Sequence, residues 1–276
     1  MLQGSPAIAI ALTFNEVTPP AVVDVLIYFT ASSLLVAHVF AFNDWADIGS
    51  DLKDPIKAPA TFVQAGLSPR GVALLSLGLG LTSLILFSLL SFWTLTLAFG
   101  VISCGLIYSD ATVRAKEVLI LSSVVHIIGG LLHFLSGYSV FGIIDQRAIL
   151  IGVYFALVFA AGHLTQEVRD YDGDLDAGTL THAVWFGKRR TLIASLVLFS
   201  ASYAYIFSLV YVGLLADFFL VALAVYPIQV FMFWRILRND VTFETVSRFQ
   251  LRYRLLFSLI GLAMLANLLN RLVTAL

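Results

Sequence analysis

The stretch VLIYFTASSLLVAHVFAFNDWADIGSD, residues 25–51, joins a strongly apolar run to an amide and three carboxylates. A helix needs about 20 mostly apolar residues to cross a bilayer. Carboxylates gathered at the end of such a helix repel one another unless a counter-charge neutralises them. The stretch therefore predicts a membrane helix that ends in a charged functional site.

The composition of the whole chain indicates an integral membrane protein. Of its 276 residues, 60% are apolar and 12% are charged, and the mean hydropathy is +0.95, whereas a soluble domain is nearer half apolar and a quarter charged. The net charge of −1 gives no sign of a nucleic-acid partner or a polybasic surface. Cys104 is the only cysteine, which excludes an intrachain disulfide and a cysteine metal site.

Eight apolar runs are long enough to span a membrane as helices. They cover about 19–45, 70–90, 92–109, 117–139, 147–168, 190–213, 216–236 and 252–275. The short apolar stretch PAIAIALTF (6–14) lacks the basic region and cleavage site of a signal peptide, so we expect it to remain in the chain. The predicted fold class is an all-α integral membrane protein, with residues 1–276 forming a single polytopic domain.

The basic residues predict the orientation of the spans. Alternating the spans leaves only Arg147 and Arg271 on one side of the membrane, out of 16 Lys and Arg. The other side receives Lys53, Lys57, Arg70, Arg114, Lys116, Arg169, Lys188, Arg189, Arg190, Arg235, Arg238, Arg248, Arg252 and Arg254. By the positive-inside rule this second side is cytoplasmic. The long polar linkers 46–69, 169–189 and 237–251 lie there too, so we expect the chemistry on that face.

Two acidic clusters share one spacing. At about 100° per residue, Asn43, Asp44, Asp47 and Asp51 fall within about 100° of one another, on one face of a helix. Gln166, Glu167, Asp170 and Asp174 repeat the pattern, each 123 residues further on (Asn43 against Gln166). The clusters close the first and the fifth span. This predicts two related halves, about 1–140 and 141–276, built on a duplicated four-helix unit.

Carboxylates in this arrangement favour Mg²⁺. Mg²⁺ takes one or two carboxylates and completes its shell with water and substrate phosphates. We predict that the two faces bind two or more Mg²⁺ against a diphosphate and stabilise it as a leaving group. The predicted metal ligands are Asp44, Asp47, Asp51, Glu167, Asp170 and Asp174, and the five aspartates are also the candidate catalytic residues. The plainer alternative, a solvated acidic cap on each helix, does not account for the matched spacing.

Basic and polar residues near the clusters are the candidate substrate ligands. Taken singly, each of these residues could be an ordinary positive-inside charge or an interfacial aromatic. Taken together, the residues fit a phosphate site. The candidates are Asn43, Lys53, Lys57, Tyr108, Arg114, Lys116, Gln166 and Arg169.

These motifs resemble the UbiA-type intramembrane prenyltransferase superfamily. The first cluster matches the family's Asn-Asp-x-x-Asp-x-x-x-Asp motif, EVRDYDGD (167–174) is similar to its second Asp-rich motif, and YSDATVRAK (108–116) is similar to its Tyr-Ser…Lys linker. The resemblance implies a helical bundle around a central cavity that opens sideways to lipid, with two Mg²⁺ and a prenyl diphosphate between the motifs. The chain would ionise the diphosphate to an allylic carbocation, which a lipophilic acceptor, most commonly aromatic, attacks. Phe40, Phe134, Phe155 and Phe159 are candidate cavity walls.

Three departures from the family pattern bear on the outcome of the reaction. The family usually has a ninth span ahead of the first motif, whereas only residues 1–18 precede it here, so that span is absent or shortened. Leu180 stands where members often have a basic residue after the second motif, and the first linker reads KAPA (57–60) where many have Arg-Pro. The loss of a basic residue leaves open a terpene cyclase of the same superfamily, in which the prenyl chain attacks itself.

A third reading is a cation- or proton-coupled transporter, for which internal repeats and buried carboxylates are also typical. The position of the carboxylates at one membrane surface argues against it. The histidines inside the spans, His126, His133 and His163, are either functional or neutral partners in interhelical hydrogen bonds, and the second interpretation is favoured. His182, in a linker, is expected to be solvated.

Overall fold

The structure, a computed structural model, describes residues 3–53, 55, 57–110, 112–113 and 115–274, with side chains described as far as Asn270. Eight helices in it are long and apolar enough to cross a membrane, which confirms the predicted number of spans. They are α2 (Pro19–Asp51), α3 (Pro69–Ser88), α4 (Phe92–Ser109), α5 (Leu119–Tyr138), α6 (Gln146–Arg169), α9 (Lys188–Tyr211), α10 (Val221–Arg238) with the preceding 3-10 turn η3 (Asp217–Leu220), and α11 (Phe243–Thr274).

Capping residues at the membrane boundaries begin several of the spans. The side chains of Thr18, Ser68, Ser91 and Asp145 each accept a hydrogen bond from a backbone N–H in the first turn of α2, α3, α4 and α6. Proline also occupies the first turn of α2 and α3, where a missing N–H costs nothing. These caps satisfy donors that would otherwise be unpaired at a helix start.

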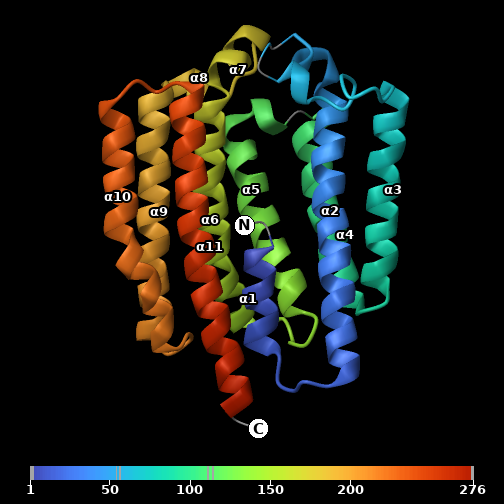
Figure 1. Cartoon of the computed structure of the whole chain (residues 1–276), viewed down its shortest axis with the longest axis vertical. Helices are drawn as coiled ribbons and strands as arrows, with labels where there is room; N and C mark the ends of the chain where they lie inside the picture. Colours follow the sequence, from blue (N-terminus) through green and yellow to red (C-terminus); the bar gives the residue numbers. More distant parts are fainter. Residues whose placement is uncertain (1–2, 54, 56, 111, 114, 275–276) are drawn as a thin grey trace.

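The helices form one bundle in which α5 and α6 occupy the middle (Figure 1). On one side α2 packs against α3 and α4, and α4 packs against α5; on the other side α6 packs against α9 and α11, and α10, at the outer edge, packs against α9 and α11. Each acidic cluster thus stands at the end of the first helix of a group, α2 or α6. The idea of two related halves is compatible with this order and stays a prediction.

A short helix, α1 (Gly4–Thr13), lies inside the bundle and packs against α5 and α11. Ten residues at about 1.5 Å each reach only half way across a hydrocarbon core of about 30 Å. Its contact with α5 is close, because a Cβ added to Gly137 would come within 2.7 Å of the Pro6 backbone. This helix is therefore largely buried and too short to cross the bilayer (Figure 1).

Two boundaries differ from the sequence prediction. The first long helix continues past residue 45 to Asp51, and α11 begins at Phe243 rather than near 252. The expectation of a long polar linker over 237–251 is wrong, because only residues 239–242 connect α10 to α11. Hydropathy marks the apolar part of a helix, whereas the hydrogen-bonded helix also continues through charged turns beyond the bilayer.

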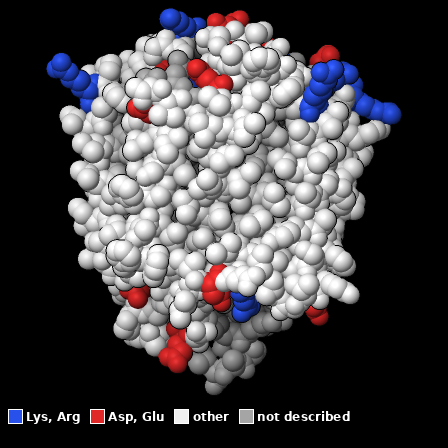
Figure 2. Space-filling model, turned by 180° about the vertical axis from the view of Figure 1, so that it is seen from behind, with Lys and Arg blue, Asp and Glu red and all other residues white. Residues whose placement is uncertain are grey.

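The outer surface has the form expected of a multi-pass membrane protein. On the face shown in Figure 2, a wide band without charged side chains covers the middle of the molecule, and charges gather at its two ends, with basic residues mainly at the end where α7 lies. Large apolar side chains such as Leu74, Ile120 and Leu251 are 68–79% exposed, as expected of residues that face lipid.

Candidate active site

The two acidic clusters meet at one end of the bundle. The first occupies the last turns of α2, and the second spans the end of α6, its C-cap and the short helix α7 (Tyr171–Ala177). The linker after α2, with its 3-10 turn η1 (Ala58–Ala60), and the linker after α4, with η2 (Ala115–Glu117), lie at the same end. The fold thus brings together three parts of the chain that are far apart in the sequence (Figure 1).

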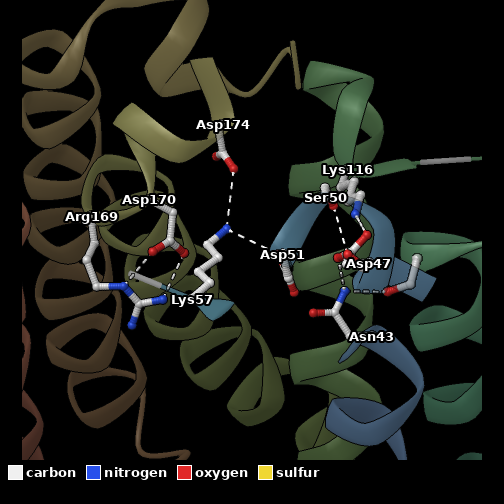
Figure 3. Close-up of polar contacts among 10 residues, drawn as sticks. Asn43, Asp47, Ser50, Asp51, Lys57, Lys116, Arg169, Asp170 and Asp174 are labelled. Carbon is white, nitrogen blue, oxygen red and sulfur yellow. Dashed lines mark hydrogen bonds and ion pairs between the residues drawn. The ribbon is translucent and has the colours of Figure 1, made fainter. Parts of the chain in front are cut away.

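The first cluster lies on one continuous helix and is held from the side by α4 and η2. Asn43 Nδ2 donates to Asp47 Oδ2 at 3.0 Å and to Ser109 Oγ at 2.9 Å. The Lys116 ammonium contacts the other oxygen of Asp47, so both carboxylate oxygens have partners (Figure 3). Ser109 was not among the predicted site residues; its place beside Tyr108 in the YSDATVRAK segment is the signal that marks it.

The second cluster is divided between two helices. The first of these, α6, ends at Arg169, and Asp170 is its C-cap before the chain turns into α7. Arg169 donates to both oxygens of Asp170 at 2.7 and 2.8 Å, a bidentate geometry that fixes the carboxylate. Gly178, with φ of +73°, ends α7, a left-handed conformation that glycine commonly supplies at a helix C-terminus.

Lys57 joins the two clusters. Its ammonium lies 3.9 Å from Asp51 of the first cluster and 3.8 Å from Asp174 of the second (Figure 3). These carboxyl groups are only 18% and 15% exposed, so one cation partly neutralises two half-buried anions. The separation of the clusters is therefore small enough for one charged group to contact both.

Burial raises the pKa of Asp174 to about 7, against an ordinary value of 3.8. Lys57 opposes this shift, while the neighbouring carboxylates Asp170 and Glu167 add to it. Near neutral pH Asp174 is therefore partly protonated in the metal-free protein, and a bound cation would displace that proton.

This shift gives a prediction for the stability of the metal-free protein. Because the pKa of Asp174 is higher in the folded than in the unfolded state, the folded state binds the proton more tightly, and stability should fall as pH rises from about 4 to about 7. Asp174→Asn removes that loss, so its melting temperature in detergent with EDTA should exceed that of the wild type by several degrees at pH 8 and match it at pH 4. The matched variant Asp172→Asn, at a side chain 64% exposed, should follow the wild type. A wild-type melting temperature that does not fall over this range would contradict the assignment.

Glu167 has surroundings unlike those of the aspartates. It is 4% exposed, and it accepts from His163 Nε2 at 2.9 Å and from His182 Nδ1 at 3.0 Å. The expectation that His182 is solvated is wrong, because the short helix α8 (His182–Phe186) folds back and places this ring on Glu167. The contact was not foreseen because it depends on the turn after α7.

The other predicted substrate ligands lie around this site. Tyr108 packs edge-on against His126 and lies within electrostatic reach of Asp47 and Asp174. Gln166 is partly exposed on α6 and Lys53 is exposed in the linker after α2. Arg114 lies outside the described residues.

The fit to a divalent cation follows from the donors themselves. Among the residues that the structure describes, no three carboxylate, imidazole or thiol side chains converge into a metal site of their own. Mg²⁺ does not need such a cage, because it binds through one or two carboxylates plus water and phosphate oxygens. Two facing sets of carboxylates, each half-buried, fit Mg²⁺ that arrives with a diphosphate.

Fold and site together define a polytopic membrane protein with a divided acidic site at one membrane face. The UbiA prenyltransferase family matches residues 5–260. The chain belongs to this family and is a prenyltransferase. A search of curated proteins found no match.

Solved structures of UbiA homologues share the fold. The homologue from Archaeoglobus fulgidus bound to GPP and Mg²⁺ has a TM-score of 0.73 and 17% identity over 96% of this chain and 95% of that one. Its complex with DMAPP and Mg²⁺ gives 0.74 and 15%, covering 100% and 96%. A digeranylgeranylglyceryl phosphate synthase gives 0.68 and 16%, covering 98% and 93%. At these identities the likeness establishes the fold.

Proposed function

We propose that this chain is a Mg²⁺-dependent intramembrane prenyltransferase that moves an isoprenoid group from a prenyl diphosphate to a lipophilic, aromatic acceptor. The observation that carries the proposal is the position of Lys57 within 4 Å of a carboxylate from each cluster. A site in which one cation contacts both clusters has the dimensions for metal ions and a diphosphate. Family membership and the relatives solved with GPP, DMAPP and Mg²⁺ support the same substrate class.

The roles of the side chains follow from their contacts. Asp44, Asp47, Asp51, Asp170 and Asp174 would hold two or more Mg²⁺, which neutralise the diphosphate as it leaves carbon. Asn43 and Arg169 fix the orientation of Asp47 and Asp170, and Gln166 assists at the second cluster. Lys57 and Lys116, now on carboxylates, would turn to the diphosphate oxygens, with Lys53, Tyr108 and Arg114 beside them. Glu167 already has two imidazole donors, and we do not count it among the ligands.

The isoprenoid chain would extend from this site into the apolar interior of the bundle. Of the expected cavity walls, Phe159 keeps 38% exposure and Phe40 keeps 56%. Phe134 is fully buried against Phe155, with ring centroids 4.8 Å apart, so its assignment as a wall is wrong: it fills the core. The isoprenoid chain would therefore lie along Phe159.

The site is proposed to face the cytoplasm. The support is the excess of Lys and Arg at the end of the molecule that carries the acidic clusters (Figure 2), which is the bias of cytoplasmic loops.

The test is to incubate purified protein with geranyl, farnesyl or geranylgeranyl diphosphate, with and without phenolic acceptors. We expect pyrophosphate release that EDTA stops and added Mg²⁺ restores, together with a prenylated acceptor. The absence of Mg²⁺-dependent pyrophosphate under every condition would refute the proposal. Cyclic products formed without an acceptor would instead support the terpene cyclase, which is favoured by the exposed Leu180 in place of a basic residue after the second motif. Family membership removes the transporter reading.

A further inference from the structure

A cluster of three histidines lies directly beneath the acidic site. The rings of His126 on α5 and His163 on α6 stack with centroids 3.5 Å apart and an interplanar angle of 11°. Behind them, Glu167 accepts hydrogen bonds from His163 and His182. Since an ionised carboxylate only accepts, the nitrogens that face Glu167 carry hydrogen, and the cluster ends in a buried negative charge.

The tautomer of His126 is set by its backbone partner. Its Nδ1 lies 2.9 Å from the carbonyl oxygen of Ser122, and a carbonyl can only accept, so Nδ1 carries the hydrogen. In the neutral ring, Nε2 is then an unprotonated base. No hydrogen-bond partner of His126 Nε2 occurs among the described residues.

His126 faces the inside of the protein. It shares one stripe of α5 with Gly130 and Gly137, which pack against α6 and α1, where an added Cβ would meet Phe159 and Pro6. On this inner stripe His126 is still partly exposed, and its neighbour Phe159, 5.6 Å away between ring centroids, is 38% exposed. The free nitrogen therefore belongs to a partly exposed side chain that lies between α5 and α6.

Tyr108 lies between His126 and the acidic site. Its ring lies 4.8 Å from that of His126, and it lies within electrostatic reach of carboxylates from both clusters. A prenyl diphosphate held at the clusters would thus place its first carbon atoms near His126. The base and the leaving group would stand at opposite ends of one site.

We propose that His126 Nε2 takes the proton released when the allylic cation is quenched, which rests on the proposed function above. The electron pair of the C1–O bond leaves with the diphosphate. An acceptor X–H then forms a C1–X bond, the electrons of its X–H bond stay on X, and the proton passes to Nε2. His163 acts as a positioning residue, because it stacks on the ring that becomes positive and connects it to the Glu167 carboxylate.

The same proton transfer is measurable without an acceptor. From the geranyl cation, a methyl C–H next to C3 gives up its proton to Nε2, and its electron pair becomes a double bond, which yields an acyclic hydrocarbon. Capture of the cation by water yields an alcohol instead. The ratio of hydrocarbon to alcohol therefore reports the base, while pyrophosphate reports ionisation, the preceding step.

The experiment compares wild type, His126→Gln, His126→Ala and the control His133→Gln with geranyl diphosphate and Mg²⁺. Both His126 variants should lower the ratio of hydrocarbon to alcohol by about 10-fold or more, as expected for loss of a general base, and imidazole in the buffer should restore it in His126→Ala. His133, two turns further along α5 and bonded to Ser32, should leave the ratio unchanged when replaced. An unchanged ratio in the His126 variants, or wild-type products consisting of alcohols alone, would overturn the inference, whereas no pyrophosphate from wild type would refute the proposed function itself.

Discussion

Replacing Asp47 or Asp170 with asparagine should lower Mg²⁺-dependent pyrophosphate release by about 10²–10³-fold, the usual cost of removing one electrostatic group from a catalytic site. Neighbouring donors orient both carboxylates, Asp47 through Asn43 and Lys116, and Asp170 through Arg169. Asparagine keeps the volume and removes the charge, so the protein should still fold. The measurement is the rate of release from geranyl diphosphate, together with the melting temperature in detergent.

Asp172→Asn is the matched control for this prediction. Asp172 lies two residues from Asp170, but its side chain points to Lys188 at 2.9 Å and is 64% exposed. It should keep wild-type turnover. Rates within about threefold of wild type for both Asp47→Asn and Asp170→Asn would rule out the metal role of these residues.

The fold was largely predictable because a membrane helix is a local property of the sequence. In lipid, a run of about 20 apolar residues must satisfy its backbone hydrogen bonds within the run itself, as a helix. Each of the eight spans can therefore be predicted from its own stretch of sequence. The start of α11 was not predictable this way, because Arg248, Arg252 and Arg254 lower the hydropathy of turns that are still helical. The short helix α1 depends on the close contact of Pro6 with Gly137, which no local pattern encodes.

The candidate site was also predictable only in part. Helical periodicity placed Asn43, Asp44, Asp47 and Asp51 on one face, and the structure keeps them on one helix. The partners of these residues were not predictable, because Lys57 reaches Asp174 across 117 positions (174 against 57) and His182 reaches Glu167 only after a turn. Spacing gives the faces of helices, whereas contacts between linkers depend on tertiary packing.

The structure also explains how like charges are tolerated at the end of a membrane helix. Asp47 has Lys116, Asp170 has Arg169, and Asp51 and Asp174 share Lys57. Burial disfavours the charged form of a carboxyl group, and it raises the pKa of Asp174 to about 7 even with Lys57 beside it. In the metal-free protein, basic side chains thus neutralise carboxylates that Mg²⁺ would neutralise when it binds.

Lys57→Met should weaken binding of the prenyl diphosphate by about 10- to 100-fold, the equivalent of one charge-assisted hydrogen bond, seen as a raised KM with a smaller change in kcat. The same variant should lower the melting temperature of the metal-free protein at pH 8, because Asp51 and Asp174 lose the cation they share. Adding Asp174→Asn to Lys57→Met should recover much of that stability, since the two changes affect one interacting group and are not additive. Steady-state kinetics and thermal unfolding with EDTA measure the two effects separately.

Lys188→Met provides the comparison, because Lys188 is also a lysine paired with an aspartate at this face of the protein but contacts Asp172, outside the two clusters. It should change neither KM nor the effect of Asp174→Asn. If Lys57→Met matched Lys188→Met in KM, the lysine between the clusters would be a structural counter-charge only. If instead KM rose while metal-free stability stayed the same, Lys57 would bind substrate without stabilising Asp51 and Asp174 in the metal-free protein. Lys57 is proposed to leave Asp51 and Asp174 and to contact the diphosphate when substrate binds. Only a joint loss of substrate affinity and metal-free stability supports this proposal.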